Sequence, residues 1–174
     1  MIKIWLLAAA FSLIAGWTDW RSRRIPNWLT VPGLVVGVLA NFIIFGWPGC
    51  KLALLGAGLG LLLLLPFVAL RSLGAGDWKL VGALGAFLGP QRLLLVLLGT
   101  FLVNGIMAVG LIIWKRRVWR TLRNLASMAG SLLTFHMPGP EVSLDNPESL
   151  KIPFGVGVAI TVAACAVTVW WRPL

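Results

Sequence analysis

The chain has 174 residues, of which 59% are hydrophobic and only 11% are charged, and its mean hydropathy is +0.94. Soluble domains carry about 25% charged residues, so this composition excludes a soluble protein and indicates a polytopic membrane protein. The formal net charge of +10 does not indicate a nucleic-acid-binding protein, because the basic residues stand at the ends of apolar segments, as they do in membrane proteins. We therefore expect membrane lipids as partners and no nucleic acid.

We predict an all-α fold with about six transmembrane helices, in one integral membrane domain that covers residues 1–174. The first span is retained, because no small-residue cleavage site of a signal peptide follows it. The fourth span is shorter than the roughly 20 residues that a crossing needs, so it begins earlier or is shielded by its neighbours. The predicted spans are residues 2–18, 29–47, 52–70, 78–89, 93–114 and 152–171.

Loops and turns separate these spans. A polar loop is predicted at residues 19–28 and a tight turn at residues 47–50. Residues 115–135 carry apolar side chains three and four positions apart among many basic ones, which predicts an amphipathic helix on the cytoplasmic membrane surface. Three glycines of the third span would allow close helix packing, namely Gly56, Gly58 and Gly60.

The distribution of basic residues predicts the orientation. If the first loop faces the cytoplasm, eleven of the fifteen basic residues lie on the cytoplasmic side and four lie outside. Cytoplasmic loops are enriched in Lys and Arg, so we expect the N-terminus outside. The cytoplasmic set is Arg21, Arg23, Arg24, Arg71, Lys79, Lys115, Arg116, Arg117, Arg120, Arg123 and Lys151, and the outer set is Lys3, Lys51, Arg92 and Arg172.

Only five residues of the chain are acidic. Two of them, Asp19 and Asp77, stand where long apolar segments meet charge, and the predicted orientation places both at the cytoplasmic boundary. An ionisable side chain beside lipid is costly and is rarely kept without a use. The other three, Glu141, Asp145 and Glu148, fall between prolines in a stretch that we interpret as a solvated loop.

Two carboxylates that lie together cannot both ionise easily and come to share one proton. The ionised one can take a proton from water while the protonated one polarises a peptide carbonyl, which hydrolyses an amide without a covalent intermediate. Such a dyad loses activity at both extremes of pH. Gly74 and Gly76 would let a substrate backbone pass close to Asp77. The alternative is that each aspartate simply pairs with a neighbouring Arg or Lys.

No metal or organic cofactor is expected. Cys50 and Cys165 are far apart and form no CxxC motif, so we interpret them as apolar filler residues. His136 is the only histidine and has no second ligand at a metal-binding spacing, which favours a surface position.

Two motifs surround the aspartates, and a third element opens the last span. The first motif is Asp19-x-Arg21-x-x-x-Ile25-Pro26-Asn27, the second is Gly74-x-Gly76-Asp77-x-Lys79, and the third element is Lys151-Ile152-Pro153-Phe154-Gly155. Pro153 and Gly155 are expected to shape the entry of the last helix. In this order the three resemble the type IV prepilin peptidases, a family of GxGD-type membrane aspartic proteases related to archaeal preflagellin peptidases.

The resemblance implies that Asp19 and Asp77 are catalytic. It also implies removal of the basic leader from prepilin-like precursors at the cytoplasmic face of the bacterial inner membrane. Longer bacterial members carry an N-terminal cytoplasmic domain, often with paired CxxC motifs, that is associated with N-methylation of the new pilin N-terminus. Here Asp19 comes early and no CxxC exists, so the chain is similar to the short members that serve Flp-type tight-adherence pili, and N-methylation is not expected.

Four further motif residues have roles that the sequence leaves open. Lys79 would tune the dyad, bind a substrate group or anchor its helix at the membrane interface. Arg21 would orient the first aspartate or meet a lipid phosphate. Pro26 and Asn27 are expected to shape the loop that places the first aspartate.

The prediction is therefore a membrane aspartic endopeptidase, and two other classes remain as alternatives. A small ion- or proton-relay transporter would hold the two acids near the middle of the membrane, with interrupted helices around a central site. A structural subunit of a pilus-assembly machine would need no chemistry and would leave the paired motifs unexplained. The sequence predicts neither the oligomeric state nor the particular precursor.

Overall fold

A computed structural model describes residues 2–69, 73–114 and 153–171. Within these ranges the protein is all-helical, and each helix is long and apolar enough to cross a membrane. This confirms the predicted all-α class, while the predicted amphipathic helix at residues 115–135 lies outside the described ranges. The helices are α1 (Ile2–Ser22), α2 (Asn27–Ala69), α3 (Ala75–Trp114) and α5 (Phe154–Trp171).

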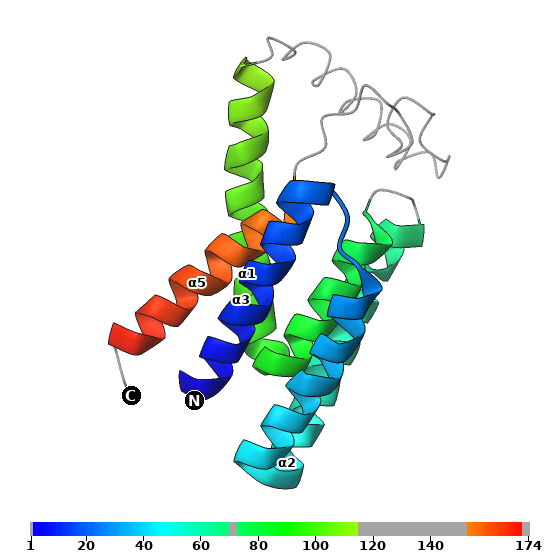
Figure 1. Ribbon diagram of the computed structural model, residues 1–174, viewed down its shortest axis with the longest axis vertical. Coiled ribbons are helices and arrows are strands. Elements are labelled where there is room, and N and C mark those ends of the chain that lie inside the picture. The colour runs from blue at the N-terminus through cyan, green and yellow to red at the C-terminus, as the bar shows by residue number, and fades with distance from the viewer. Residues whose placement is uncertain (1, 70–72, 115–152, 172–174) are drawn as a thin grey trace.

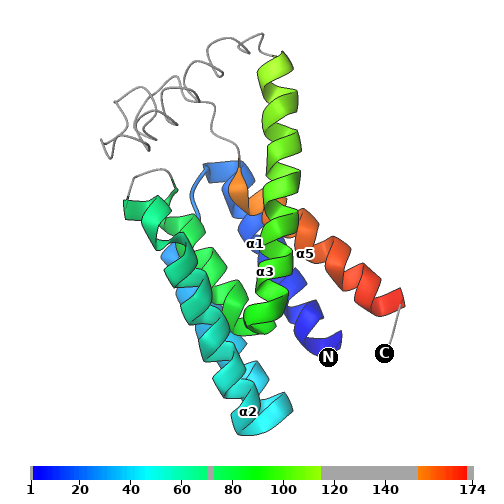
Figure 2. The same cartoon turned by 180° about the vertical axis from the view of Figure 1, so that it is seen from behind.

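Both long helices are broken once by a glycine. At 1.5 Å per residue, the 43 residues of α2 and the 40 of α3 would be about twice as long as the hydrocarbon core is thick. Gly46 (φ 65°) and Gly89 (φ 74°) have non-helical backbone angles that glycine adopts at little cost. The chain turns back at each of them, so α2 and α3 each consist of two antiparallel segments (Figure 1 and, from behind, Figure 2).

The first of these breaks corrects one predicted boundary. The turn was expected at residues 47–50, but those residues are helical and the break is at Gly46. Pro48 lies in the first turn of the segment that follows, where its missing N–H leaves no hydrogen bond unmade. The reversal therefore needs one glycine rather than a four-residue loop.

Small residues hold α2 against α3. A β-carbon on Gly56 would collide with the carbonyl of Gly85, and one on Gly60 would lie 3.0 Å from the carbonyl oxygen of Val81. These two glycines confirm the predicted close packing, but Gly58 has nothing within 4 Å and that part of the prediction is wrong. The amide of the buried Asn41 donates to the carbonyl oxygens of Ala86 and Phe87, at 2.9 Å each, near the end of the first α3 segment.

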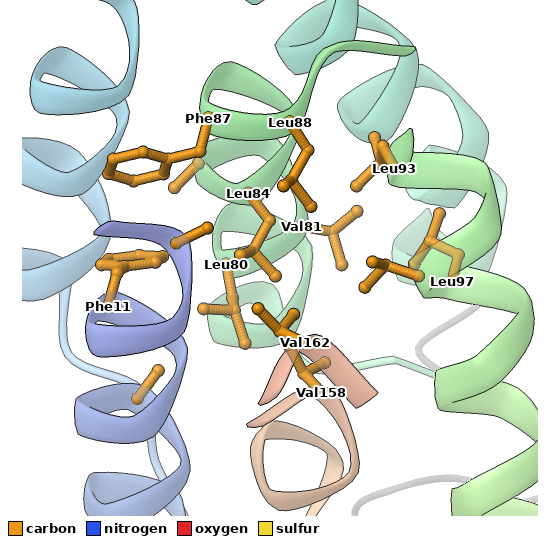
Figure 3. Close-up of a cluster of buried hydrophobic side chains, with 14 of the residues drawn as sticks. Phe11, Leu80, Val81, Leu84, Phe87, Leu88, Leu93, Leu97, Val158 and Val162 are labelled. Carbon is orange, nitrogen blue, oxygen red and sulfur yellow. The ribbon is translucent and has the colours of Figure 1, made fainter. Parts of the chain in front are cut away.

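The core lies where α1, α3 and α5 meet. Figure 3 shows Phe11 facing Phe87, and these rings have centroids 5.4 Å apart. Phe11 also occupies the space beside Gly33 of α2, where a β-carbon would collide with its ring. Leu80, one turn after Asp77, is completely buried in the same cluster. The core thus fixes the helices that carry the two aspartates.

Tryptophans near the segment ends face outward. Trp17, Trp28 and Trp114 are 66%, 67% and 85% exposed. Amphipathic indole rings favour the level of the lipid headgroups, so these positions fit the membrane interface that the sequence predicts.

Candidate active site

Asp19 lies in the last turn of α1 and not in a loop. The prediction of a polar loop at residues 19–28 was wrong at its first four and its last two positions, because α1 continues to Ser22 and α2 already begins at Asn27. Arg23 then takes a left-handed conformation (φ 54°), and its N–H donates to the carbonyl oxygen of Asp19 at 2.8 Å, which ends the helix. The side chain of Asp19 is only 6% exposed and faces α5.

The carboxylate of Asp19 is bound by the beginning of α5. The backbone N–H of Gly155 donates to its Oδ2 at 2.8 Å. The first N–H groups of a helix have no acceptor within that helix, and they carry the positive end of the helix dipole. An acidic side chain from another helix therefore fits this position well. The sequence predicted Gly155 as part of the helix entry but gave no signal that its N–H meets Asp19.

Asp77 lies in the first turn of α3 and is partly buried. The carbonyl of Gly74 accepts the first backbone hydrogen bond of this helix, from Trp78 at 3.2 Å. Gly74 is thus the N-cap residue, and its backbone in turn hydrogen-bonds the carboxylate of Asp77 three positions later. This is the half of a capping box in which an acidic side chain reaches back to the N-cap.

A second hydrogen bond fixes the first turn of α3 to its neighbour. The indole Nε1 of Trp78, the residue after Asp77, donates to the carbonyl oxygen of Leu61 on α2 at 2.7 Å. Because the bond is partly buried, it is little weakened by water. It restrains the helix turn that presents Asp77.

The two aspartates lie near each other although they are 58 positions apart in the sequence. They are close enough for the charge of Asp19 to act on Asp77. Their motifs also touch, because a β-carbon on Gly76 would lie 3.0 Å from the carbonyl oxygen of the buried Ile25. A β-carbon on Gly74 would lie 3.1 Å from Asp77 Oδ2. The absence of a side chain at Gly74 and Gly76 therefore permits close packing around Asp77 and between the two motifs.

The other motif residues make contacts at the ends of the helices. Lys79 Nζ donates to Asn27 Oδ1 at 2.9 Å, which ties the start of α3 to the start of α2. The carbonyl of Pro26 accepts from the N–H groups of Leu29 and Thr30, at 3.1 and 3.3 Å, in the first turn of α2. Arg21 is exposed on the last turn of α1.

The chemistry available at this position is that of two neighbouring carboxylates. Among the residues that the structure describes, no group of three or more His, Cys, Asp or Glu side chains could hold a metal ion. Two carboxylates in contact with helix N-termini can share a proton and act as acid and base toward one bound water and one carbonyl.

Comparisons with curated proteins found relatives that match part of the chain. Two curated proteins named prepilin leader peptidase/N-methyltransferase, from Aeromonas hydrophila and Aeromonas salmonicida (strain A449), are each 34% identical to this chain over 122 residues. The aligned part covers 66% of this chain and 40% of each relative, so the chain spans less than half the length of these relatives. No solved structure matches.

The sequence model of the type IV leader peptidase family matches residues 6–109. The matched range is more than half of the chain and contains Asp19, Asp77 and both motifs around them, whereas Gly155 lies beyond it. The protein is a membrane protein that belongs to the type IV leader peptidase family.

Proposed function

We propose that the protein is a membrane aspartic endopeptidase that cleaves the basic leader from prepilin-like precursors, with Asp19 and Asp77 as its catalytic dyad. The observation that carries the proposal is the proximity of these two carboxylates, which come from separate helices and are each hydrogen-bonded to the start of a helix. Membership of the family supports the reaction class, and the names of the curated relatives support the precursor class.

The proposed reaction needs only water and the two side chains. The ionised carboxylate takes a proton from water as the water oxygen bonds to the scissile carbonyl carbon, and the protonated carboxyl gives its proton to the carbonyl oxygen. A neutral tetrahedral gem-diol results. Its C–N bond then breaks, the nitrogen receives a proton from the dyad, and one hydroxyl returns its proton to the dyad. The products are a leader with a new carboxyl group and a mature protein with a new amine.

The proposed topology has six membrane crossings. Each segment of α2 and α3 would cross once, with the turns at Gly46 and Gly89 on one side and both aspartates on the other. The ends of α1 and α5 that meet at Asp19, and the start of α3, lie toward the same end of the bundle in both views (Figures 1 and 2). The excess of Lys and Arg on that side of the predicted topology supports a cytoplasmic active site and an outer N-terminus.

The proposed substrate has a short basic leader directly before an apolar helix. A scissile bond at the lipid–water boundary would meet two acids at helix ends, which is where Asp19 and Asp77 lie. Flp-type precursors are the proposed members of this class. The proposal is confined to hydrolysis, because acid–base groups are what the dyad supplies.

A cleavage assay tests the proposal. The full chain in lipid nanodiscs is incubated with a pilin precursor from the same organism, and cleavage is measured for wild type, Asp19→Asn and Asp77→Asn. Asn keeps the shape of the side chain and removes its ionisation, so we expect each variant to lose at least about 100-fold in rate. Asp145→Asn is the matched control and should cleave normally. Full activity of both dyad variants would refute the proposal.

A further inference from the structure

The hydrogen bond between Gly155 and Asp19 joins residues 136 positions apart. We propose that Gly155 is a positioning residue, whose backbone N–H holds the carboxylate of Asp19 in its reacting orientation toward Asp77. This inference rests on the proposed function and adds to it a fixed support supplied by the last helix.

Burial makes this backbone donor important to Asp19. The residue is 6% exposed, so little water reaches its carboxylate, and a buried charge that loses a hydrogen bond is strongly destabilised. The N–H of Gly155 is available because it belongs to the first turn of α5, where the helix itself offers no acceptor. The next N–H, of Val156, donates instead to the carbonyl oxygen of Pro153 at 3.2 Å.

The position is tight for any residue that has a side chain. A β-carbon on Gly155 would lie 3.0 Å from Asp19 Cβ, 3.1 Å from Asp19 Oδ2 and 3.3 Å from the carbonyl oxygen of Ala15. One turn earlier in α1 and one turn later in α5, a β-carbon on Gly16 would lie 2.9 Å from Ala159 Cβ. Small residues thus let α1 and α5 approach so closely that a main-chain N–H reaches a side chain of the other helix.

The consequence concerns the orientation of the reacting oxygens. Because Oδ2 of Asp19 is held by Gly155, the rotation of the carboxyl group is restricted and Oδ1 is the oxygen left for water or for Asp77. Asp77 is held in the same way by the backbone of Gly74. Each carboxylate therefore has its own helix N-terminus as a support, and the pair is preorganised before substrate arrives.

The test removes one backbone hydrogen-bond donor and leaves all side chains unchanged. Glycolic acid replaces Gly155 during cell-free synthesis of the full chain into lipid nanodiscs, which turns the amide N–H into an ester oxygen. The matched control replaces Val156 by its hydroxy-acid analogue, which removes a donor from the same helix turn without touching Asp19. We expect kcat for precursor cleavage to fall roughly 10- to 100-fold in the residue-155 ester with an unchanged KM, and less than about 3-fold in the control.

Equal losses of kcat in the two esters, or no loss in the residue-155 ester, would overturn the inference.

A second measurement does not depend on cleavage. The chain has three aspartates, Asp19, Asp77 and Asp145, so their ¹³Cγ signals can be assigned with single Asn variants. The Asp19 signal should move in the residue-155 ester and stay in the residue-156 ester. If wild type cleaves no precursor but this signal moves, the proposed function fails while the support of Asp19 stands; a signal that stays overturns that support.

Discussion

Gly76 lies against the backbone of Ile25, so closely that a β-carbon on it would be 3.0 Å from the Ile25 carbonyl oxygen and 3.2 Å from Ile25 Cβ. The sequence predicted that Gly76 opens a path for the substrate backbone. The contact gives it a second role, because it lets the segment after Asp19 pack against the turn that carries Asp77.

Gly76→Ala separates the two roles. The added methyl must push Ile25 away, so we expect the free energy of unfolding to fall by about 1–3 kcal/mol and cleavage to fall at least about 10-fold. The measurements are thermal unfolding in nanodiscs and the cleavage rate. Gly58→Ala is the control, because nothing lies within 4 Å of it. Unchanged stability with a raised KM would favour the substrate path alone.

Trp78→Phe tests whether the hydrogen bond to Leu61 restrains the helix turn that carries Asp77. Phe keeps an aromatic ring and removes the indole N–H that donates at 2.7 Å. Loss of one such bond costs about 1 kcal/mol and leaves a carbonyl of α2 without this donor, so we expect a small drop in unfolding temperature and a several-fold lower kcat. Trp17→Phe is the control, since Trp17 is 66% exposed. Identical behaviour of the two variants would contradict the assigned role.

Lys79 and Asn27 are predicted to act as one unit. Their side chains are hydrogen-bonded at 2.9 Å, and exposed contacts of this kind are worth no more than about 1 kcal/mol. We expect Lys79→Met and Asn27→Ala to reduce cleavage by similar, modest factors, and the double variant to lose no more than either single one. If Lys79→Met alone abolishes cleavage, Lys79 acts on the dyad or the substrate rather than through Asn27.

The sequence predicted the parts of the fold that depend on composition and spacing. Long apolar runs predicted the helices, and the position of two isolated acids at the ends of such runs singled out Asp19 and Asp77 as the candidate pair. It missed the continuation of α1 through Asp19, because Asp19, Trp20 and Arg21 have the polarity of a loop and yet complete a helical turn. Polarity marks where a helix leaves the apolar layer, and it does not mark where the helix ends.

The contact between Asp19 and Gly155 could not be predicted from the sequence. Its donor is a main-chain N–H, which every residue except proline carries, so no residue type marks it. Only the close crossing of α1 and α5 at Gly16 and Ala159 brings that N–H to the carboxylate. The placement of the break at Gly46 was missed by one residue for a related reason, since several neighbouring residues are equally typical of a turn.

The central claim is that Asp19 and Asp77 act as a single catalytic unit. The most direct test is a double-mutant cycle on cleavage of one pilin precursor, with wild type, Asp19→Asn, Asp77→Asn and the double variant at equal protein levels in nanodiscs. For a shared-proton dyad, either single variant removes the whole function, so the double variant should be no slower than the slower single one. If the two single losses instead multiply in the double variant, the aspartates act independently and the proposed dyad is wrong.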